Sequence, residues 1–223
     1  MIEAISKEAR WFLTREKIQP IKVWFENLDK PQYLGDNDIY PRQDYYLIMP
    51  GVENLGIKIR EPKKDTASGK LKTTFEVKRL ISENEQIELG NNNKAYSNKW
   101  QKLGYELTEG GNDLLSVNSL SPSSGSSWLR VDKNRILAKY DAEHKSIAEE
   151  NAYPDETCGI ELTRVKIDNS VYYSFGLEAF SKSGYKRDEN LSGCCSFIFD
   201  QIVLTGLTLE SSLSYPEFLA RMR

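Results

Sequence analysis

The sequence predicts a domain of the α+β class that is mainly β, and three observations lead to this prediction. Short segments alternate charged and aliphatic residues, as in residues 56–60, Gly-Ile-Lys-Ile-Arg. A strand has a period of two, so each kind of side chain occupies its own face. Aromatic residues, which favour strands, are plentiful, with 12 Tyr, 8 Phe and 4 Trp. A chain of 223 residues is also long enough for one β-rich domain with a sizeable core.

The first half of the chain is predicted to hold two helices and four strands, and the last two strands form a hairpin with a long loop. A helix over residues 20–28 begins with a proline and repeats apolar residues three to four positions apart. Residues 94–103 indicate a second, short helix around Trp100. The polar residues 62–70 form the loop of the hairpin. The expected strands are residues 5–13, 44–49, 55–61 and 72–81.

The second half of the chain continues the same strand pattern. The serine-rich residues 119–127 predict a flexible loop, and because similar strands resume directly after it we expect a single domain over residues 1–223. Helices are expected at residues 190–204 and 214–219. The remaining strands are expected at residues 128–141, 158–167 and 170–181.

Charged residues of both signs share faces on these strands, and two interpretations are open. On an open sandwich the faces would be solvated, with cross-strand ion pairs of small energy. On a curled sheet they would line a cavity. Arg10, which stands between Ala9 and Trp11 in an otherwise apolar strand, favours the cavity. The charged positions are Arg10, Lys58, Arg60, Lys78, Lys133, Arg135 and Lys139, with Glu8, Glu76, Glu161 and Glu178.

A cavity lined with arginine and lysine suits a phosphorylated ligand. A triphosphate carries about four negative charges at neutral pH. Arginine binds phosphate oxygens in pairs and lysine acts as a point charge. Glutamate can hold Mg²⁺ or Mn²⁺ opposite, and the metal polarises a phosphoryl group or positions a water. Such chemistry needs no covalent nucleophile, and the sequence has no glycine-rich phosphate-binding loop.

Charge and composition exclude other classes of function. The net charge of −3 argues against a general nucleic-acid or membrane-surface binder, so no DNA partner is expected. Cys158, Cys194 and Cys195 have no metal-binding spacing and are expected to be reduced core residues. His144 is the only histidine, so any catalytic triad would have to use it, and we therefore do not expect a triad. Without a signal-peptide pattern or a stretch of transmembrane length, we expect a cytoplasmic protein, monomeric or homodimeric.

Motifs of charged and aromatic residues run in order along nearly the whole chain. They are Glu8-x-Arg10-Trp11-Phe12, Trp24-Phe25, Arg42-x-Asp44-x-Tyr46, Gly56-x-Lys58-x-Arg60-Glu61, Glu76-x-Lys78, Lys133-x-Arg135, Cys158-Gly-x-Glu161-Leu-Thr163, Ser174-x-Gly176-x-Glu178 and Ser214-Tyr-Pro-Glu-Phe-Leu219. Together they resemble the CYTH-like superfamily, which includes the triphosphate tunnel metalloenzymes. The resemblance implies a closed antiparallel eight-stranded barrel with charged side chains in its tunnel and helices outside.

The resemblance also implies roles for the charged residues. The family's first strand normally reads Glu-x-Glu-x-Lys, and the aligned Ser6 removes one carboxylate, as Gly176 does later in the chain. Glu8 and Glu178 are the implied catalytic residues, and Glu76 lies elsewhere in the tunnel. The implied metal ligands are Glu8, Glu161 and Glu178, for Mg²⁺ or Mn²⁺. The implied phosphate-binding residues are Arg10, Lys58, Arg60, Lys78, Lys133, Arg135 and Lys139.

Two functions follow as expectations. The first is a metal-dependent phosphohydrolase acting on a small triphosphate or organic polyphosphate bound in the tunnel. The second is a non-catalytic binding protein for a phosphorylated or polyanionic ligand in the same tunnel. The missing carboxylates at Ser6 and Gly176 give the second function weight close to that of the first.

Overall fold

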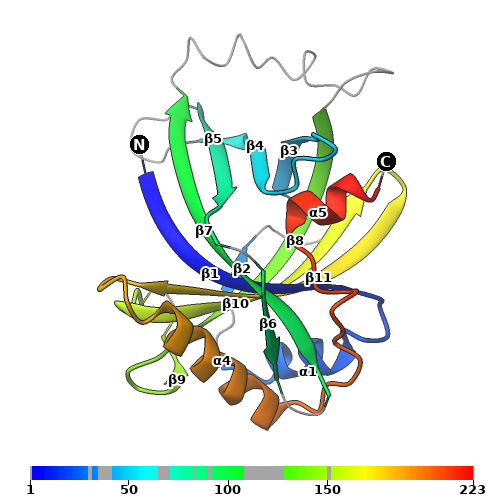
Figure 1. Cartoon of the computed structure of the whole chain (residues 1–223). Coiled ribbons are helices and arrows are strands. Elements are labelled where there is room, and N and C mark those ends of the chain that lie inside the picture. Colours follow the sequence, from blue (N-terminus) through cyan, green and yellow to red (C-terminus); the bar gives the residue numbers. More distant parts are fainter. Residues whose placement is uncertain are drawn as a thin grey trace.

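A computed structural model of the whole chain shows a sheet closed on itself (Figure 1). The structure describes residues 2–29, 32–34, 42–64, 71–82, 84–89, 92–107, 128–149 and 152–222. The expected loop of residues 119–127 and most of the hairpin loop of residues 62–70 lie outside the described residues. The single domain over residues 1–223 stays a prediction.

Eight antiparallel strands form the barrel. Around it they follow the order β1-β11-β10-β8-β3-β4-β5-β7, and β7 pairs with β1 to close the ring. The closed eight-stranded barrel is therefore confirmed, and the open sandwich is wrong. The strands are β1 (Ile2–Leu13), β3 (Arg42–Leu47), β4 (Leu55–Lys64), β5 (Leu71–Leu80), β7 (Lys94–Leu107), β8 (Trp128–Asp141), β10 (Glu156–Ile167) and β11 (Ser170–Ser181).

Shorter elements surround the barrel. Helix α4 packs against β1, β10 and β11, and α5 contacts β4 (Figure 1). Trp24 of α1 donates a hydrogen bond to Gln201 at the end of α4, at 2.9 Å, so these two helices are joined. Extra strands pair with β8 and β7. These elements are α1 (Gln19–Glu26), α4 (Arg187–Gln201), α5 (Tyr215–Ala220), β2 (Gln32–Leu34), β6 (Glu85–Glu88) and β9 (Ser146–Ile147).

One predicted element is wrong in type. Residues 94–103 belong to strand β7 and not to a helix, because β7 fills the gap between β5 and β1 and supplies backbone hydrogen bonds to both. A helix cannot do this, since its backbone groups bond within it. The helix expected over residues 190–204 begins and ends three residues earlier, at Arg187–Gln201, because Ile202 is already extended, with φ −124° and ψ 125°. No helix of the described residues is long and apolar enough to cross a membrane.

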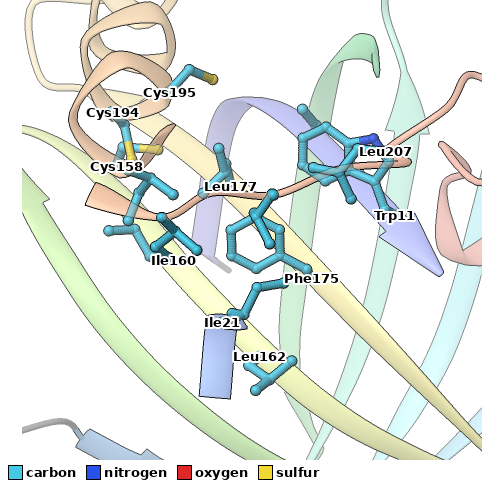
Figure 2. Close-up of a cluster of buried hydrophobic side chains, with 14 of the residues drawn as sticks. Trp11, Ile21, Cys158, Ile160, Leu162, Phe175, Leu177, Cys194, Cys195 and Leu207 are labelled. Carbon is cyan, nitrogen blue, oxygen red and sulfur yellow. The ribbon is translucent and has the colours of Figure 1, made fainter. Parts of the chain in front are cut away.

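The main hydrophobic core lies outside the barrel and not within it. Trp11, Ile160, Phe175 and Leu177 are completely buried on the outward faces of β1, β10 and β11, next to α4 (Figure 2). The three cysteines are buried in the same cluster and are not in disulfides. Because successive side chains of a strand point to opposite faces, packing the apolar face under a helix turns the charged face into the barrel.

Candidate ligand-binding tunnel

The interior of the barrel contains a cavity of about 160 Å³ lined with charged side chains. Its lining includes eight basic and four acidic side chains, so basic groups predominate. All eight barrel strands contribute to it, although β10 gives only Glu161 and β11 only Glu178. The basic residues are Arg10, Arg42, Lys58, Arg60, Lys78, Lys102, Lys133 and Arg135, and the acidic ones are Glu8, Glu76, Glu161 and Glu178.

Arg10 is the centre of the first cluster of charges. Its Nε donates to Glu8 Oε1 at 2.7 Å, and its Nη1 donates to Glu161 Oε1 and to Ser174 Oγ, both at 3.1 Å. Lys78 bonds the second oxygen of Glu8. Burial alone would raise the pKa of Glu8, but the charges of Lys78 and Arg10 outweigh burial and lower this pKa to about 2.

Glu161 is held in the same way from β10. Arg135 Nη1 donates to Glu161 Oε2 at 3.0 Å, and Thr163 donates to Oε1 at 2.9 Å. Although burial opposes ionisation, Arg10 and Arg135 keep the pKa of Glu161 well below its ordinary value. Both oxygens of this carboxylate are therefore occupied by cationic partners.

Asp44 of β3 is the centre of a second cluster and is completely buried. Arg42 Nη2 donates to Asp44 Oδ2 at 2.6 Å, and the amines of Lys58 and Lys133 lie 3.6 Å from the same oxygen. Lys133 also donates to the Tyr46 hydroxyl at 2.6 Å. Burial lowers the pKa of Lys133 well below its ordinary value, in spite of Asp44.

Glu76 of β5 links a third group of cations. Lys58 Nζ lies 3.0 Å from Glu76 Oε2, Arg60 Nε lies 2.8 Å from Oε1 and Lys102 Nζ lies 3.7 Å from Oε1. Burial would raise the pKa of Glu76, yet these cations lower it to about 2. Burial also lowers the pKa of Lys58 to about 8, because Asp44 and Glu76 compensate only part of its desolvation.

Helix α5 places an aromatic ring against these clusters. The Ser214 side chain accepts from the Glu217 backbone, and the Glu217 carboxylate accepts from the Ser214 backbone, so the helix begins with a capping box. The Tyr215 ring consequently lies 3.6 Å from Lys133 Nζ and 5.0 Å from the Arg10 guanidinium carbon. Cations over an aromatic face are attracted by its quadrupole, which stabilises this charge-rich interior.

Three tunnel arginines keep buried donors without a hydrogen-bond acceptor. Among the residues that the structure describes, Arg42 Nε and Nη1, Arg60 Nε and Arg135 Nε have no such partner, although Arg60 Nε is ion-paired with Glu76. A buried donor left unsatisfied is costly, and charged donors cost more than neutral ones. These groups are therefore suited to an acceptor that enters from outside, and phosphate oxygens match the fork of a guanidinium.

A second cavity, of about 350 Å³, continues from the first. The two share Arg10, Arg135, Glu161 and Glu178 in their linings. Beyond these residues the second cavity is lined largely by apolar and aromatic side chains. They include Leu137, Tyr153, Pro154 and Phe180.

The structure brings most of the predicted site residues together. Of the expected residues, six basic and all four acidic side chains line the first cavity. Lys139 does not: it donates to the Ala152 carbonyl at 2.8 Å, lies over the Tyr153 ring and lines only the second cavity. The specific roles of all these residues as phosphate-binding, metal-binding or catalytic groups stay predictions.

Five tunnel residues were not assigned to the site from the sequence, although four of them stand in the motifs that carry the family resemblance. Arg42, Asp44 and Tyr46 share one face of β3, and this parity was the signal that could have found them. Lys102 was missed because residues 94–103 were assigned to a helix, and Tyr215 because a short terminal helix gave no sign of facing the tunnel.

The carboxylates expected to hold a metal do not fit a divalent cation as they lie. Both oxygens of Glu8 and of Glu161 are bound by arginine or lysine. Glu178 accepts from Ser6 at 2.9 Å and has Lys78 at 3.6 Å. Within the described ranges, no group of three or more acidic, histidine or cysteine side chains is arranged to hold a metal ion.

Comparisons with known proteins add the following. No family model matches the chain, and no curated protein matches it. Solved structures that match include a protein of Bacillus halodurans provisionally named an adenylate cyclase, with 11% identity, a TM-score of 0.47 and coverage of 92% of this chain and 96% of that one. A protein of Pyrococcus horikoshii has 13% identity, a TM-score of 0.47 and full coverage of both chains.

An RNA triphosphatase of S. pombe, in complex with the Spt5 CTD, has 10% identity, a TM-score of 0.41 and coverage of 89% of this chain and 81% of that one. These are distant similarities of chain path. The tunnel barrel that the CYTH-like resemblance implies is confirmed by the strand pairing and inward charges of the chain itself.

Proposed function

We propose that the barrel tunnel binds a small triphosphate or organic polyphosphate. The observation that carries this proposal is that eight basic and four acidic side chains line the first cavity, so that basic groups predominate even when the buried Asp44 behind them is counted. A triphosphate carries about four negative charges at neutral pH, and a cavity of this kind attracts it. Because the whole chain has a net charge of −3, it repels a long nucleic acid overall, which favours a small anion that fits the tunnel.

Donors and charges in the tunnel support the binding of phosphate groups. Arg42 and Arg135 have buried N–H groups that lack an acceptor among the described side chains. A phosphate oxygen would satisfy them with charge-assisted hydrogen bonds. Lys58 and Lys102 flank Glu76 on the neighbouring strands and would act as point charges toward the same ligand.

The second cavity supports a ligand that carries an organic group. It adjoins the phosphate-binding residues through Arg10 and Arg135, and its further lining includes Leu137, Tyr153 and Phe180. Apolar and aromatic side chains bind an organic ring or chain by removing its surface from water, which they cannot do for a phosphate. The proposed ligand is therefore an organic polyphosphate in preference to inorganic tripolyphosphate.

Metal-dependent hydrolysis is the second candidate function, and Glu178 is the observation that favours it. Its carboxylate lines both cavities, and its side chain is 31% exposed. This candidate requires Mg²⁺ or Mn²⁺ to displace the arginine and lysine partners of Glu8 and Glu161. In this candidate Glu8 and Glu178 are the catalytic carboxylates, and Glu161 is the third predicted metal ligand.

Thermal stability and phosphate release together test both candidates. Tripolyphosphate, thiamine triphosphate and ATP are each added with Mg²⁺, with Mn²⁺ or with EDTA. Binding raises the melting temperature as ligand concentration rises, and the organic ligands are expected to raise it more. If none of them stabilises the protein, the binding function is wrong.

Phosphate release then separates the enzyme from the binding protein. Turnover that depends on metal and disappears in Glu178→Gln supports hydrolysis. Stabilisation without turnover identifies a binding protein. Location in the cytoplasm, and the monomeric or homodimeric state, stay predictions.

A further inference from the structure

Arg10 lies among the carboxylates of the tunnel in the place where a metal ion would be expected. Its guanidinium contacts Glu8, Glu161 and Ser174, on three neighbouring strands, and its side chain is only 7% exposed. It thus bridges two of the three carboxylates that were candidates to hold a cation. Because it lines both cavities, the same guanidinium also faces the space available to a ligand.

The guanidinium of Arg10 has room in this position because residue 176 is a glycine. Gly176 pairs with Arg10 across β1 and β11, and with Glu161 across β10 and β11. A Cβ atom on Gly176 would lie 2.6 Å from Arg10 Cζ and 2.7 and 2.8 Å from its two terminal nitrogens. No side chain fits there while Arg10 keeps its position. The glycine is therefore the partner of an arginine, in addition to being a missing carboxylate.

Lys78 joins the remaining pair of carboxylates. Its amine bonds Glu8 and lies 3.6 Å from Glu178 Oε1, the oxygen that also accepts from Ser6. All three carboxylates consequently have Arg10 or Lys78 as a partner. Two fixed positive charges in this cluster equal the charge of one divalent ion. A metal entering here would have to break several charge-assisted bonds, which are the strong ones in proteins.

We propose that Arg10 and Lys78 are the resident cations of this tunnel, so that it binds polyphosphates without a divalent metal. The inference rests on the proposed polyphosphate-binding function and narrows it. Arg10 and Lys78 neutralise the carboxylates and leave the arginines and lysines of the other strands to hold the phosphates. Polyphosphates are then recognised as free anions and not as metal complexes.

Calorimetric titration of the unmodified protein is the first test. We expect no saturable binding of Mn²⁺ or Mg²⁺ when either is added alone. We expect tripolyphosphate to bind in EDTA. When Mg²⁺ is present, the affinity calculated from the concentration of metal-free tripolyphosphate should be the same as in EDTA. A stoichiometric Mn²⁺ site in the free protein would overturn the proposal, and so would binding of tripolyphosphate that requires metal.

Variants sharpen the test. Arg10→Ala should weaken tripolyphosphate binding in EDTA by about tenfold or more, and Mn²⁺ should restore part of it, because Glu8 and Glu161 lose a shared cation. The matched control is Arg130→Ala, since Arg130 lies on the other face of β8 with its side chain 46% exposed. Equal effects of the two substitutions would contradict the proposal. If Arg10→Ala does not fold, Arg10→Lys and the titrations of the unmodified protein decide.

The two proposals fail in different ways. If tripolyphosphate, thiamine triphosphate and ATP all fail to bind with and without metal, the proposed function is wrong, and the Mn²⁺ titration still decides whether the carboxylates are free. If polyphosphates bind only as metal complexes, the proposed function stands and the resident-cation proposal is wrong.

Discussion

The two sides of the barrel wall differ in what covers their outer faces. On β1, β10 and β11 the outward Trp11, Phe175 and Leu177 are completely buried in the cluster that includes α4 (Figure 2). On β4 and β5 the outward Ile57 and Phe75 are only half-buried, and the described cluster against which Phe75 packs buries only Tyr45 and Ile59. We call these the covered wall and the bare wall.

The difference separates two kinds of charged group inside the tunnel. The covered wall holds Glu8, Arg10 and Glu161 on strands fixed by the main core. The bare wall holds Lys58, Arg60 and Glu76 on a hairpin that has less packing behind it among the described residues. Residues that have few buried contacts open more readily. We therefore expect the covered wall to set the geometry of the site and the bare wall to adjust to the ligand.

The largest expected effect is on the free energy of unfolding. This prediction tests whether packing on the covered wall contributes most of the protein's stability. Trp11→Ala should lower the free energy of unfolding by about 3–5 kcal/mol, because it leaves a large cavity in the core. Phe75→Ala should cost clearly less, since Phe75 is half-buried. Urea denaturation of both variants checks this, and equal losses would contradict the comparison.

A second prediction separates the inner and outer faces of the bare wall. Arg60→Ala should weaken polyphosphate binding by about 1.5–3 kcal/mol, because it removes a charge-assisted contact in the tunnel. Arg79→Ala is the matched control, since Arg79 lies on the same hairpin, is exposed and bonds Gln101. Calorimetry would measure both, and similar losses would indicate diffuse surface attraction.

A third prediction uses two glycines of the covered wall. Gly176→Ala should destabilise the protein by about 1–3 kcal/mol, because the new methyl group meets the Arg10 guanidinium. Gly159→Ala should change stability by less than about 0.5 kcal/mol, since the nearest atoms to its Cβ would be 3.7 Å away. Thermal denaturation compares the two. A tolerant Gly176 would mean that Arg10 moves freely, and the covered wall would not be fixed.

The smallest expected effect is a pH dependence that belongs to the bare wall. Glu8 and Glu76, whose pKa values are lowered to about 2, stay ionised above pH 5. Lys58, whose pKa is lowered to about 8, loses its proton as pH rises through 8, so polyphosphate affinity should fall there. Lys58→Arg should remove this fall, because arginine keeps its charge. Binding titrations from pH 7 to about pH 9 check it.

The same pKa of Lys58 has the opposite effect on folding. Its value in the folded state, about 8, lies below the ordinary value of 10.5. Between these values the unfolded chain binds more protons, so the contribution of Lys58 to stability rises with pH across this window. Denaturation at several pH values should show this rise in the original protein and lose it in Lys58→Arg.

The strands were predictable where a strict period of two carried the signal. The strand predicted at residues 170–181 has these bounds in the structure, and apolar residues stand at every second position from Val171 to Ala179. The strand predicted at residues 128–141 also has its predicted bounds, although its charges fall on both faces. Strand β7 was not predictable, because around Trp100 polar residues stand on both faces and hide the period. Its identity depends on its neighbours β1 and β5, and single-sequence patterns do not contain them.

The sequence predicted which face of its strand each charged residue occupies, but not which residues contact one another in the tunnel. Parity placed Arg10, Lys58 and Glu161 inside the barrel. It could not show that Asp44 would gather cations from three strands, because cross-barrel distances depend on how far each strand is shifted along its neighbour. Nor could it show that Lys139, with the same parity as Arg135, lies beyond the first cavity.

The closing seam of the barrel has a consequence for how the protein is made. In β1, Lys7 pairs with Lys99 on one side and with Ala179 on the other. Partners so distant along the chain are slow to meet, because a long loop must close before any contact forms. During synthesis the strand that carries Arg10 must therefore wait, with one edge unpaired, until β11 has left the ribosome. Until then the sheet is open, and its unpaired edges can pair with other chains and aggregate.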